Sequence, residues 1–220
     1  MSLPNGGTIL STDFNDILLE CHKEYDWFSL STPKGSITNT ELFYIYQQLR
    51  IMKPIVLIES GVYLGRSTLV FSKMMKPFGK VIAFNYHVDP VDAEKSHIKD
   101  IEKNNPNLTV INEKTEVGID KINWEERSFL VIDGPKPAGF LRGRNGWEVL
   151  AKSLSLRSFL CFFQHDISFE LNRTILLDYH KRFFQEYNYS EISEEYLKSN
   201  VFHGRTDKPN LAMLKKSCKF

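Results

Sequence analysis

The chain has 220 residues, of which 42% are hydrophobic and 25% are charged, and its formal net charge is +1. This length suits one domain with a substantial core, and the balanced charge favours neither nucleic acid nor an anionic membrane as a partner. No apolar run approaches the roughly 20 residues that span a bilayer, and the polar first residues lack the features of a signal peptide. We therefore expect a cytoplasmic protein without a membrane partner, and a homo-oligomer stays open.

The cysteines Cys21, Cys161 and Cys218 lie far apart in the sequence and show no C-x-x-C spacing. An odd number of cysteines without that spacing supports neither a disulfide framework nor a zinc site. We expect three free thiols.

Two helices are predicted before the first strand. The stretch from Thr12 to Lys23 has helical spacing of its apolar residues. Thr38 and Glu41 have the spacing of a capping box, in which a hydroxyl and a carboxylate satisfy the free backbone donors at a helix start. That second helix is predicted to end near Met52.

The next stretch is the most informative part of the chain. Ile55 to Ile58 form an apolar run typical of a strand buried on both faces, and Glu59 ends it. Gly61 and Gly65 bracket a tight turn that lets a ligand approach the backbone, and Ser67 opens a helix. Because a helix start has unpaired N–H groups and a partial positive charge, this turn can bind an anionic or polar group.

Strands and helices continue to alternate up to the C-terminus. Further strands are predicted at 81–84, 108–111, 129–132, 159–163, 189–192 and 211–214, and helices at 89–104, 117–122, 147–156 and 171–187. This alternation predicts an open, doubly wound α/β sheet with helices on both faces, whose last two strands are antiparallel. We assign residues 38–220 to this single domain and residues 1–37 to an N-terminal cap segment with one helix.

Ligands of such sheets bind at the carboxyl ends of the strands. The segments predicted to line that edge are 59–67, 85–89, 112–115, 133–136 and 164–166.

Residues 59–67 read ESGVYLGRS. They match E-x-G-x-x-x-G-x-S, so the chain resembles the class I methyltransferases that use S-adenosylmethionine, in the branch with this motif. VIDG at 131–134 and FFQHD at 162–166 are similar to the family's fourth and fifth strand endings. The resemblance covers roughly residues 38–220. It implies a Rossmann-like sheet of seven strands, mostly parallel, with one antiparallel strand near the C-terminus.

The resemblance implies S-adenosylmethionine as the cofactor. Glu59 would help to place its methionine end, and Gly61 and Gly65 would let the backbone pass close beneath it. The implied cofactor-binding residues are Glu59, Ser60, Gly61, Tyr63, Gly65, Arg66, Ser67, Asn85, Tyr86, His87, Lys114, Thr115 and Asp133.

Asn85 departs from the family's pattern, which has an acidic residue at the end of the second strand to hold both ribose hydroxyls. An asparagine accepts a hydrogen bond without the strength that a carboxylate's charge adds. We expect weaker cofactor binding, or a transfer of this role to His87 or Asp89.

Methyl transfer from a sulfonium mainly requires alignment of donor and acceptor, but an oxygen acceptor gains from losing its proton. His165 is the predicted general base, together with Asp133 as a catalytic residue, and a structural role is the competing interpretation. Some O-methyltransferases of this superfamily bind a divalent cation where Asp133 and Asp166 stand. These two residues therefore predict a site for Mg²⁺ or another divalent cation, unless they only end a strand and cap a helix.

A basic loop follows the fourth strand. It contains Lys136, Arg142 and Arg144, which either bind an anionic group of the acceptor or only keep the loop solvated.

The sequence thus predicts an S-adenosylmethionine-dependent methyltransferase of a small-molecule acceptor, acting by O-methylation. The alternative is a catalytically silent protein that keeps the fold for binding or assembly. A dinucleotide-dependent oxidoreductase is weaker, since no G-x-G-x-x-G follows the first strand.

Overall fold

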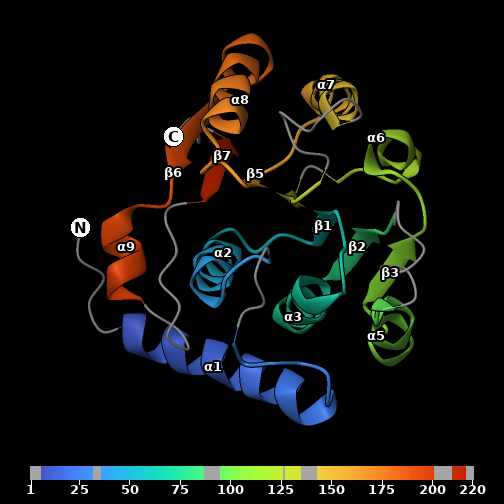
Figure 1. Cartoon of the computed structure of the whole chain (residues 1–220), viewed down its shortest axis with the longest axis vertical. Coiled ribbons are helices and arrows are strands. Elements are labelled where there is room, and N and C mark those ends of the chain that lie inside the picture. The colour runs from blue at the N-terminus through green and yellow to red at the C-terminus, as the bar shows by residue number, and fades with distance from the viewer. Residues whose placement is uncertain are drawn as a thin grey trace.

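The computed structural model describes residues 6–31, 36–86, 95–125, 127–134, 143–200 and 210–216. These residues form a seven-stranded sheet of order β3-β2-β1-β4-β5-β7-β6 (Figure 1). The strands are β1 (Val56–Ser60), β2 (Lys80–Phe84), β3 (Leu108–Ile111), β4 (Ser128–Ile132), β5 (Cys161–His165), β6 (Tyr187–Glu191) and β7 (Leu211–Lys216). The strands β1 to β5 pair in parallel, and β7 is antiparallel to both β5 and β6. The predicted doubly wound sheet is confirmed.

Helices cover both faces of the sheet (Figure 1). One face carries α2 (Asn39–Met52), α3 (Arg66–Met75) and α5 (Ile98–Asn104), with α1 (Gly6–Glu24) outside them; the other carries α6 (Thr115–Gly118), α7 (Gly143–Ser155) and α8 (Glu170–Phe183). A 3₁₀-helix, η1 (Ile119–Lys121), follows α6, and α9 (Glu194–Ser199) follows β6. Among the described helices, none has both the length and the apolar character to cross a membrane.

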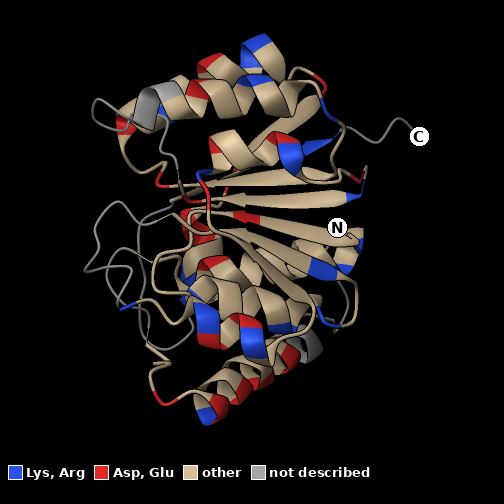
Figure 2. Cartoon of the chain, turned by 90° about the vertical axis from the view of Figure 1, so that its right-hand side faces the viewer, with Lys and Arg blue, Asp and Glu red and all other residues tan. Residues whose placement is uncertain are grey.

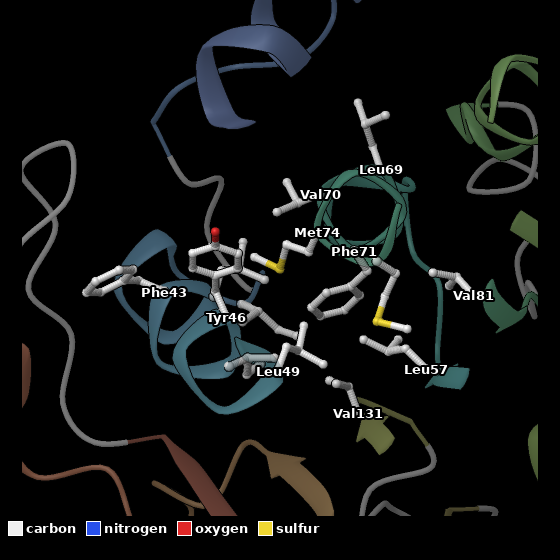
Figure 3. Close-up of a cluster of buried hydrophobic side chains, with 14 of the residues drawn as sticks. Phe43, Tyr46, Leu49, Leu57, Leu69, Val70, Phe71, Met74, Val81 and Val131 are labelled. Atoms are coloured by element: carbon white, nitrogen blue, oxygen red, sulfur yellow. The ribbon is translucent and has the colours of Figure 1, made fainter. Parts of the chain in front are cut away.

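The larger part of the core lies between the sheet and the pair α2 and α3. Figure 3 shows Leu57, Val81 and Val131 of the sheet facing Phe71 of α3 and Leu49 of α2, and all five are buried. Burying a side chain of this kind contributes about 1.5–3 kcal/mol. The charged residues lie mainly on the helices, while the strands are almost entirely uncharged (Figure 2). This distribution explains why the strands read as continuous apolar runs.

The predicted capping box forms at the start of α2. The backbone N–H of Glu41 donates to Oγ1 of Thr38 at 3.2 Å, and the backbone N–H of Thr38 donates to Oε2 of Glu41 at 2.8 Å. The predicted end of this helix at Met52 is also confirmed.

The predicted boundaries fail near the C-terminus. The helix expected to reach Tyr187 ends at Phe183, because Tyr187 instead opens β6, where its ring stacks on Phe159 at 4.5 Å. Helix α9, capped by Ser193, was not predicted, since six residues are too few for periodicity to reveal. The helix predicted at 117–122 is α6 followed by η1, and of the helix predicted at 89–104 only the end lies within the described residues.

Candidate functional site

The glycine turn after β1 locks the ends of two strands together. Gly61 and Gly65 have φ values of +92° and +94°, in the left-handed region that favours glycine. A Cβ atom on Gly61 would lie 2.6 Å from the backbone nitrogen of Gly134. The backbone N–H groups of Asp133 and Gly134 donate to the carbonyl of Ser60 at 2.8 and 3.0 Å. The carboxyl ends of β1 and β4 therefore touch, and this contact requires glycine at position 61.

Strand alternation decides which face each residue at this edge occupies. Leu57, Val131 and Phe163 belong to the core on the face of α2 and α3. Side chains two residues apart share a face. The side chains of Glu59 and His165 therefore lie on the same face of the sheet as those of Leu57 and Phe163, which is the face that α2 and α3 cover.

Glu59 is a buried carboxylate beneath the first turn of α3. It is 1% exposed, and the hydroxyls of Ser67 and Thr68 donate to its two oxygens at 2.5 Å each. Burial, which outweighs these hydrogen bonds, raises the pKa of Glu59 to about 7, and the charge of Asp133 acts in the same direction. The site thus contains a negative charge, or a proton in its place, that has no cationic partner among the described residues.

Ser60 faces the other side of the sheet, toward α6. Its hydroxyl donates to Oγ1 of Thr115 at 2.7 Å and also contacts the carbonyl of Gly134. Next to Thr115, the ammonium of Lys114 lies 5.0 Å from the ring centre of Tyr86. Both Tyr86 and Lys114 are exposed. Tyr63, in the glycine turn, is exposed as well.

Asn85 follows β2 and presents an unpaired acceptor. Its side chain is 8% exposed, and its Nδ2 donates to Oδ1 of Asn112 at 3.0 Å. This bond fixes the orientation of the Asn85 amide, and Oδ1 is left buried without a hydrogen-bond partner among the described residues. A buried acceptor that lacks a partner costs about 1–3 kcal/mol, so a ligand donor at this position would be stabilising.

A second polar cluster surrounds His165, which is 2% exposed. Its Nδ1 lies 2.7 Å from Oδ1 of Asp133 and 3.4 Å from Oδ1 of Asp166. Its Nε2 lies 3.7 Å from Oε2 of Glu41 and 3.1 Å from Nδ2 of Asn210. Four elements contribute: α2, the ends of β4 and β5, and the start of β7.

The charge of His165 follows from these neighbours. Burial alone would lower its pKa, but the hydrogen bonds and charges of Asp133 and Glu41 outweigh burial and raise the pKa to about 10. The amide of Asn210 opposes protonation of Nε2, yet it offers only a dipole against the full charges of two carboxylates. The two carboxylates therefore favour the protonated imidazole. Glu41 was not predicted as a neighbour of His165.

Asp133, His165 and Asp166 also form a group of candidate metal ligands. Each offers one ligand atom, and these atoms all lie within 4.8 Å of one another. Asp166 has a φ of +66°, a left-handed value that is uncommon outside glycine. The carboxylate oxygens fit a hard cation and the imidazole nitrogen fits Mn²⁺ or a softer one, provided that His165 gives up its proton.

Arg66 is buried, but its partners belong to α2 and the segment after α1. Its guanidinium lies 5.0 Å from the ring centre of Phe28 and contacts Oδ1 of Asn39. In the part of the chain that the structure describes, Nε and Nη1 of Arg66 are buried without a hydrogen-bond partner.

His87, Lys136 and Arg142 lie outside the described residues; Arg144 lies in α7, of which the structure describes only the backbone at that position. Two residues of the site were missed, Glu41 and Asn210, whereas Asn112 lies in the predicted segment 112–115. Asn210 could have been found from the antiparallel direction of β7, which brings the start of that strand to the carboxyl end of β5. The only sequence signal for Glu41 is its place in the capping box of α2, which does not indicate a contact with His165.

No protein-family profile and no curated protein matches this chain. Several solved structures are similar to this chain. The precorrin-6y C5,15-methyltransferase of Geobacter metallireducens is 17% identical, with a TM-score of 0.60 over 87% of this chain and 95% of that chain. The O-methyltransferase TomG of Streptomyces achromogenes, in complex with S-adenosylmethionine, is 12% identical, with a TM-score of 0.59 over 93% of this chain and 89% of that one.

A third similar structure is an rRNA methylase of Streptococcus thermophilus, 13% identical, with a TM-score of 0.51 over 80% of this chain and 95% of that chain. Precorrin-6y and rRNA, which the descriptions of the first and third proteins name, differ in kind, whereas all three proteins share the fold. The chain therefore has the fold of the class I methyltransferases that use S-adenosylmethionine.

Proposed function

We propose that this protein is an S-adenosylmethionine-dependent methyltransferase that acts on a small-molecule acceptor by O-methylation. The observation that carries the proposal is Glu59, a buried carboxylate at the carboxyl end of β1, next to a glycine turn whose backbone a ligand can approach. Its charge suits the ammonium group at the methionine end of the cofactor. A cofactor that supplies this cation would offset the cost of ionising Glu59.

The next strand supports the same cofactor. A ribose hydroxyl is a hydrogen-bond donor, and the buried Oδ1 of Asn85 is an acceptor that lacks one. We propose that the neighbouring residues Thr115, Lys114 and Tyr86 bind the adenine; Lys114 lies 5.0 Å from the ring centre of Tyr86. The residues present therefore fit the cofactor, and the cofactor when bound supplies an activated methyl group.

The chemical step requires the acceptor oxygen to lose its proton. Because its carboxylate neighbours raise the pKa of His165, we assign proton acceptance to Asp133 and a positioning role to His165, which holds Asp133 by a 2.7 Å hydrogen bond. An Asp133→Asn variant should lose roughly 100-fold or more in kcat, as expected for the loss of a general base. An unchanged kcat in that variant would contradict the assignment.

A divalent cation is a second way to activate the oxygen, and the proximity of Asp133, His165 and Asp166 favours it. A cation held there would lower the pKa of a bound hydroxyl. In that case EDTA should abolish activity, Mn²⁺ should restore it, and Asp166→Asn should remove the response. Activity that persists in EDTA would leave Asp133 and His165 as the groups responsible.

The acceptor is proposed from charge. A formal net charge of +1 gives little attraction for a polyanion such as RNA, although an rRNA methylase is among the similar structures. Lys136, Arg142 and Arg144 follow β4 in the sequence, next to Asp133. We propose that they bind an anionic group on a small acceptor.

The first experiment is calorimetric titration with S-adenosylmethionine and S-adenosylhomocysteine, with NAD as a control. Saturable binding of the two adenosyl compounds, and none of NAD, is expected. If neither adenosyl compound binds at millimolar concentration, the second candidate is favoured, a catalytically silent protein that keeps the fold. The absence of an acidic residue at position 85 supports this candidate.

Asn85→Asp tests the ribose contact. A carboxylate makes hydrogen bonds roughly twice as strong as a neutral amide does, so S-adenosylhomocysteine should bind about 10-fold more tightly, about 1.4 kcal/mol in binding free energy. Asn85→Ala should weaken binding by a similar factor. The dissociation constants from calorimetry decide; an Asp variant that binds no better than the Ala variant would argue against a ribose at this position.

A further inference from the structure

Basic side chains gather at the edge of the sheet where the parallel strands begin. Lys80 is the first residue of β2, Lys53 and Arg127 precede β1 and β4, and the antiparallel β7 ends at this edge with Lys215 and Lys216. Lys53, Lys80 and Arg127 are exposed. In Figure 2 the parallel strands begin at the right-hand side, where several blue segments lie. This edge lies at the opposite end of the strands from the candidate site.

Backbone hydrogen bonds hold these residues next to one another. The N–H of Lys80 donates to the carbonyl of Ile55 at 3.1 Å, and the N–H of Ile55 donates to the carbonyl of Arg127 at 3.2 Å. The guanidinium of Arg127 contacts the carbonyl of Lys53. The strands β2, β1, β4, β5 and β7 follow one another in the sheet, so at a spacing of about 4.8 Å the row is about 19 Å long.

Two helix ends extend this row. Arg50 lies in the last turn of α2 and Lys76 directly follows α3, and both are exposed. We call these seven residues the basic edge. No described acidic residue forms an ion pair with any of them. The helix dipole accounts for basic residues at helix ends, but Lys80 and Arg127 stand at the starts of strands.

Exposed aliphatic side chains lie among these charges. Ile51, in the last turn of α2, is 63% exposed, and Leu156, directly after α7, is 83% exposed. Ile55, which bonds to Lys80 and Arg127 through its backbone, is 37% exposed. Basic residues with exposed apolar ones between them are typical of a surface that lies on an anionic bilayer.

The formal net charge of +1 conceals this surface. Seven basic residues form the basic edge, whereas the described acidic residues that stand just before a strand there are Glu125, near β4, and Glu186, before β6. The acidic residues that balance the total charge lie elsewhere on the protein. The expectation of no membrane partner rested on the total charge, which does not report how the charges are distributed.

We propose that the basic edge docks the protein on an anionic lipid bilayer. Nucleic acid fits this edge less well, because single strands are bound by stacking on aromatic side chains, and the exposed aromatic residues Tyr63, Tyr86 and Phe169 follow the opposite ends of the strands. A second copy of the chain would present like charges. Docking in this way leaves the candidate site facing water, where a small acceptor can reach it.

Sedimentation with vesicles tests the docking. The wild type should bind vesicles of phosphatidylcholine mixed with phosphatidylglycerol but not vesicles of phosphatidylcholine alone, and binding should weaken as salt is added. A lysine near an anionic surface contributes about 5-fold to partitioning, so Lys76→Gln combined with Lys80→Gln should lower the partition coefficient roughly 25-fold. Wild-type protein that does not bind the anionic vesicles would overturn the proposal.

Lys95→Gln combined with Lys99→Gln is the matched control. It removes the same charge from exposed positions at the start of α5, which lies near the glycine turn because the N–H of His97 donates to the carbonyl of Leu64. Vesicle binding should change little in this variant. Equal losses in the two double variants would show that total charge drives the binding, and the basic edge would not be the docking surface.

Leu156→Trp reports whether the apolar side chains of this edge enter the lipid. Its fluorescence should shift to shorter wavelength with anionic vesicles, whereas Leu171→Trp, at an exposed position at the start of α8, should show no shift. A shift in both variants or in neither would contradict the orientation. If an RNA or DNA oligonucleotide binds more tightly than the vesicles and Lys76→Gln with Lys80→Gln abolishes that binding, the edge is a nucleic-acid surface and the proposal is overturned.

Discussion

Gly61→Ala is expected to abolish cofactor binding and to destabilise the fold. The new Cβ would lie 2.6 Å from the backbone nitrogen of Gly134, and the φ of +92° at this position disfavours any L side chain. Backbone strain and overpacking each cost about 1–3 kcal/mol, so the free energy of unfolding should fall by roughly 2–4 kcal/mol. The ends of β1 and β4 would also separate, which displaces Glu59 from the cofactor.

Gly134→Ala is the matched control, since it adds the same atom to the other side of the same contact. Among the described residues, the Cβ there would meet only Cα of Gly61, at an ordinary 3.8 Å. Urea denaturation and titration with S-adenosylhomocysteine should show a large loss in Gly61→Ala and little change in Gly134→Ala. Equal behaviour of the two variants would show that the turn tolerates a side chain and that the close approach of the strands is not required.

Glu59→Gln should stabilise the free protein and abolish cofactor binding. Burial raises the pKa of Glu59 from 4.5 to about 7. Because the folded-state pKa is the higher one, the native state binds the proton more tightly, and the stability that this proton contributes is lost as the pH rises from 4.5 through about 7. The shift corresponds to about 3 kcal/mol at most, which the uncharged glutamine does not lose.

The measurement is urea denaturation of both proteins at pH 5 and pH 8. The variant's advantage in the free energy of unfolding should be small at pH 5 and approach its full value at pH 8, while binding of S-adenosylhomocysteine disappears. Glu186→Gln, at an exposed position, should change neither quantity. An advantage of equal size at both pH values would contradict a raised pKa, and normal binding by the variant would remove Glu59 from the cofactor site.

The sequence was sufficient for the layered architecture and for the position of the glycine turn. Apolar runs bounded by turns identified the five parallel strands, and the capping box placed the start of α2 at Thr38. Both signals are local, because they arise from periodicity and from side chains that bond to backbone a few residues away. Local signals failed where one spacing fitted two structures, as at Tyr187, which continues the periodicity of α8 but belongs to β6.

The composition of the candidate site was decided by tertiary structure. Glu41 reads in the sequence as a helix cap, yet α2 brings the same carboxylate to His165, and this contact contributes to keeping the imidazole protonated. Asn210 reaches the cluster only because β7 runs antiparallel to β5. Sequence spacing predicts the contacts that a residue makes within its own helix or strand. The pKa and the partners of a buried group depend instead on residues that are distant in sequence. The sequence by itself therefore determined where the carboxyl edge of the parallel strands lies, and only the packing of α2 and β7 against that edge determined which charges meet there.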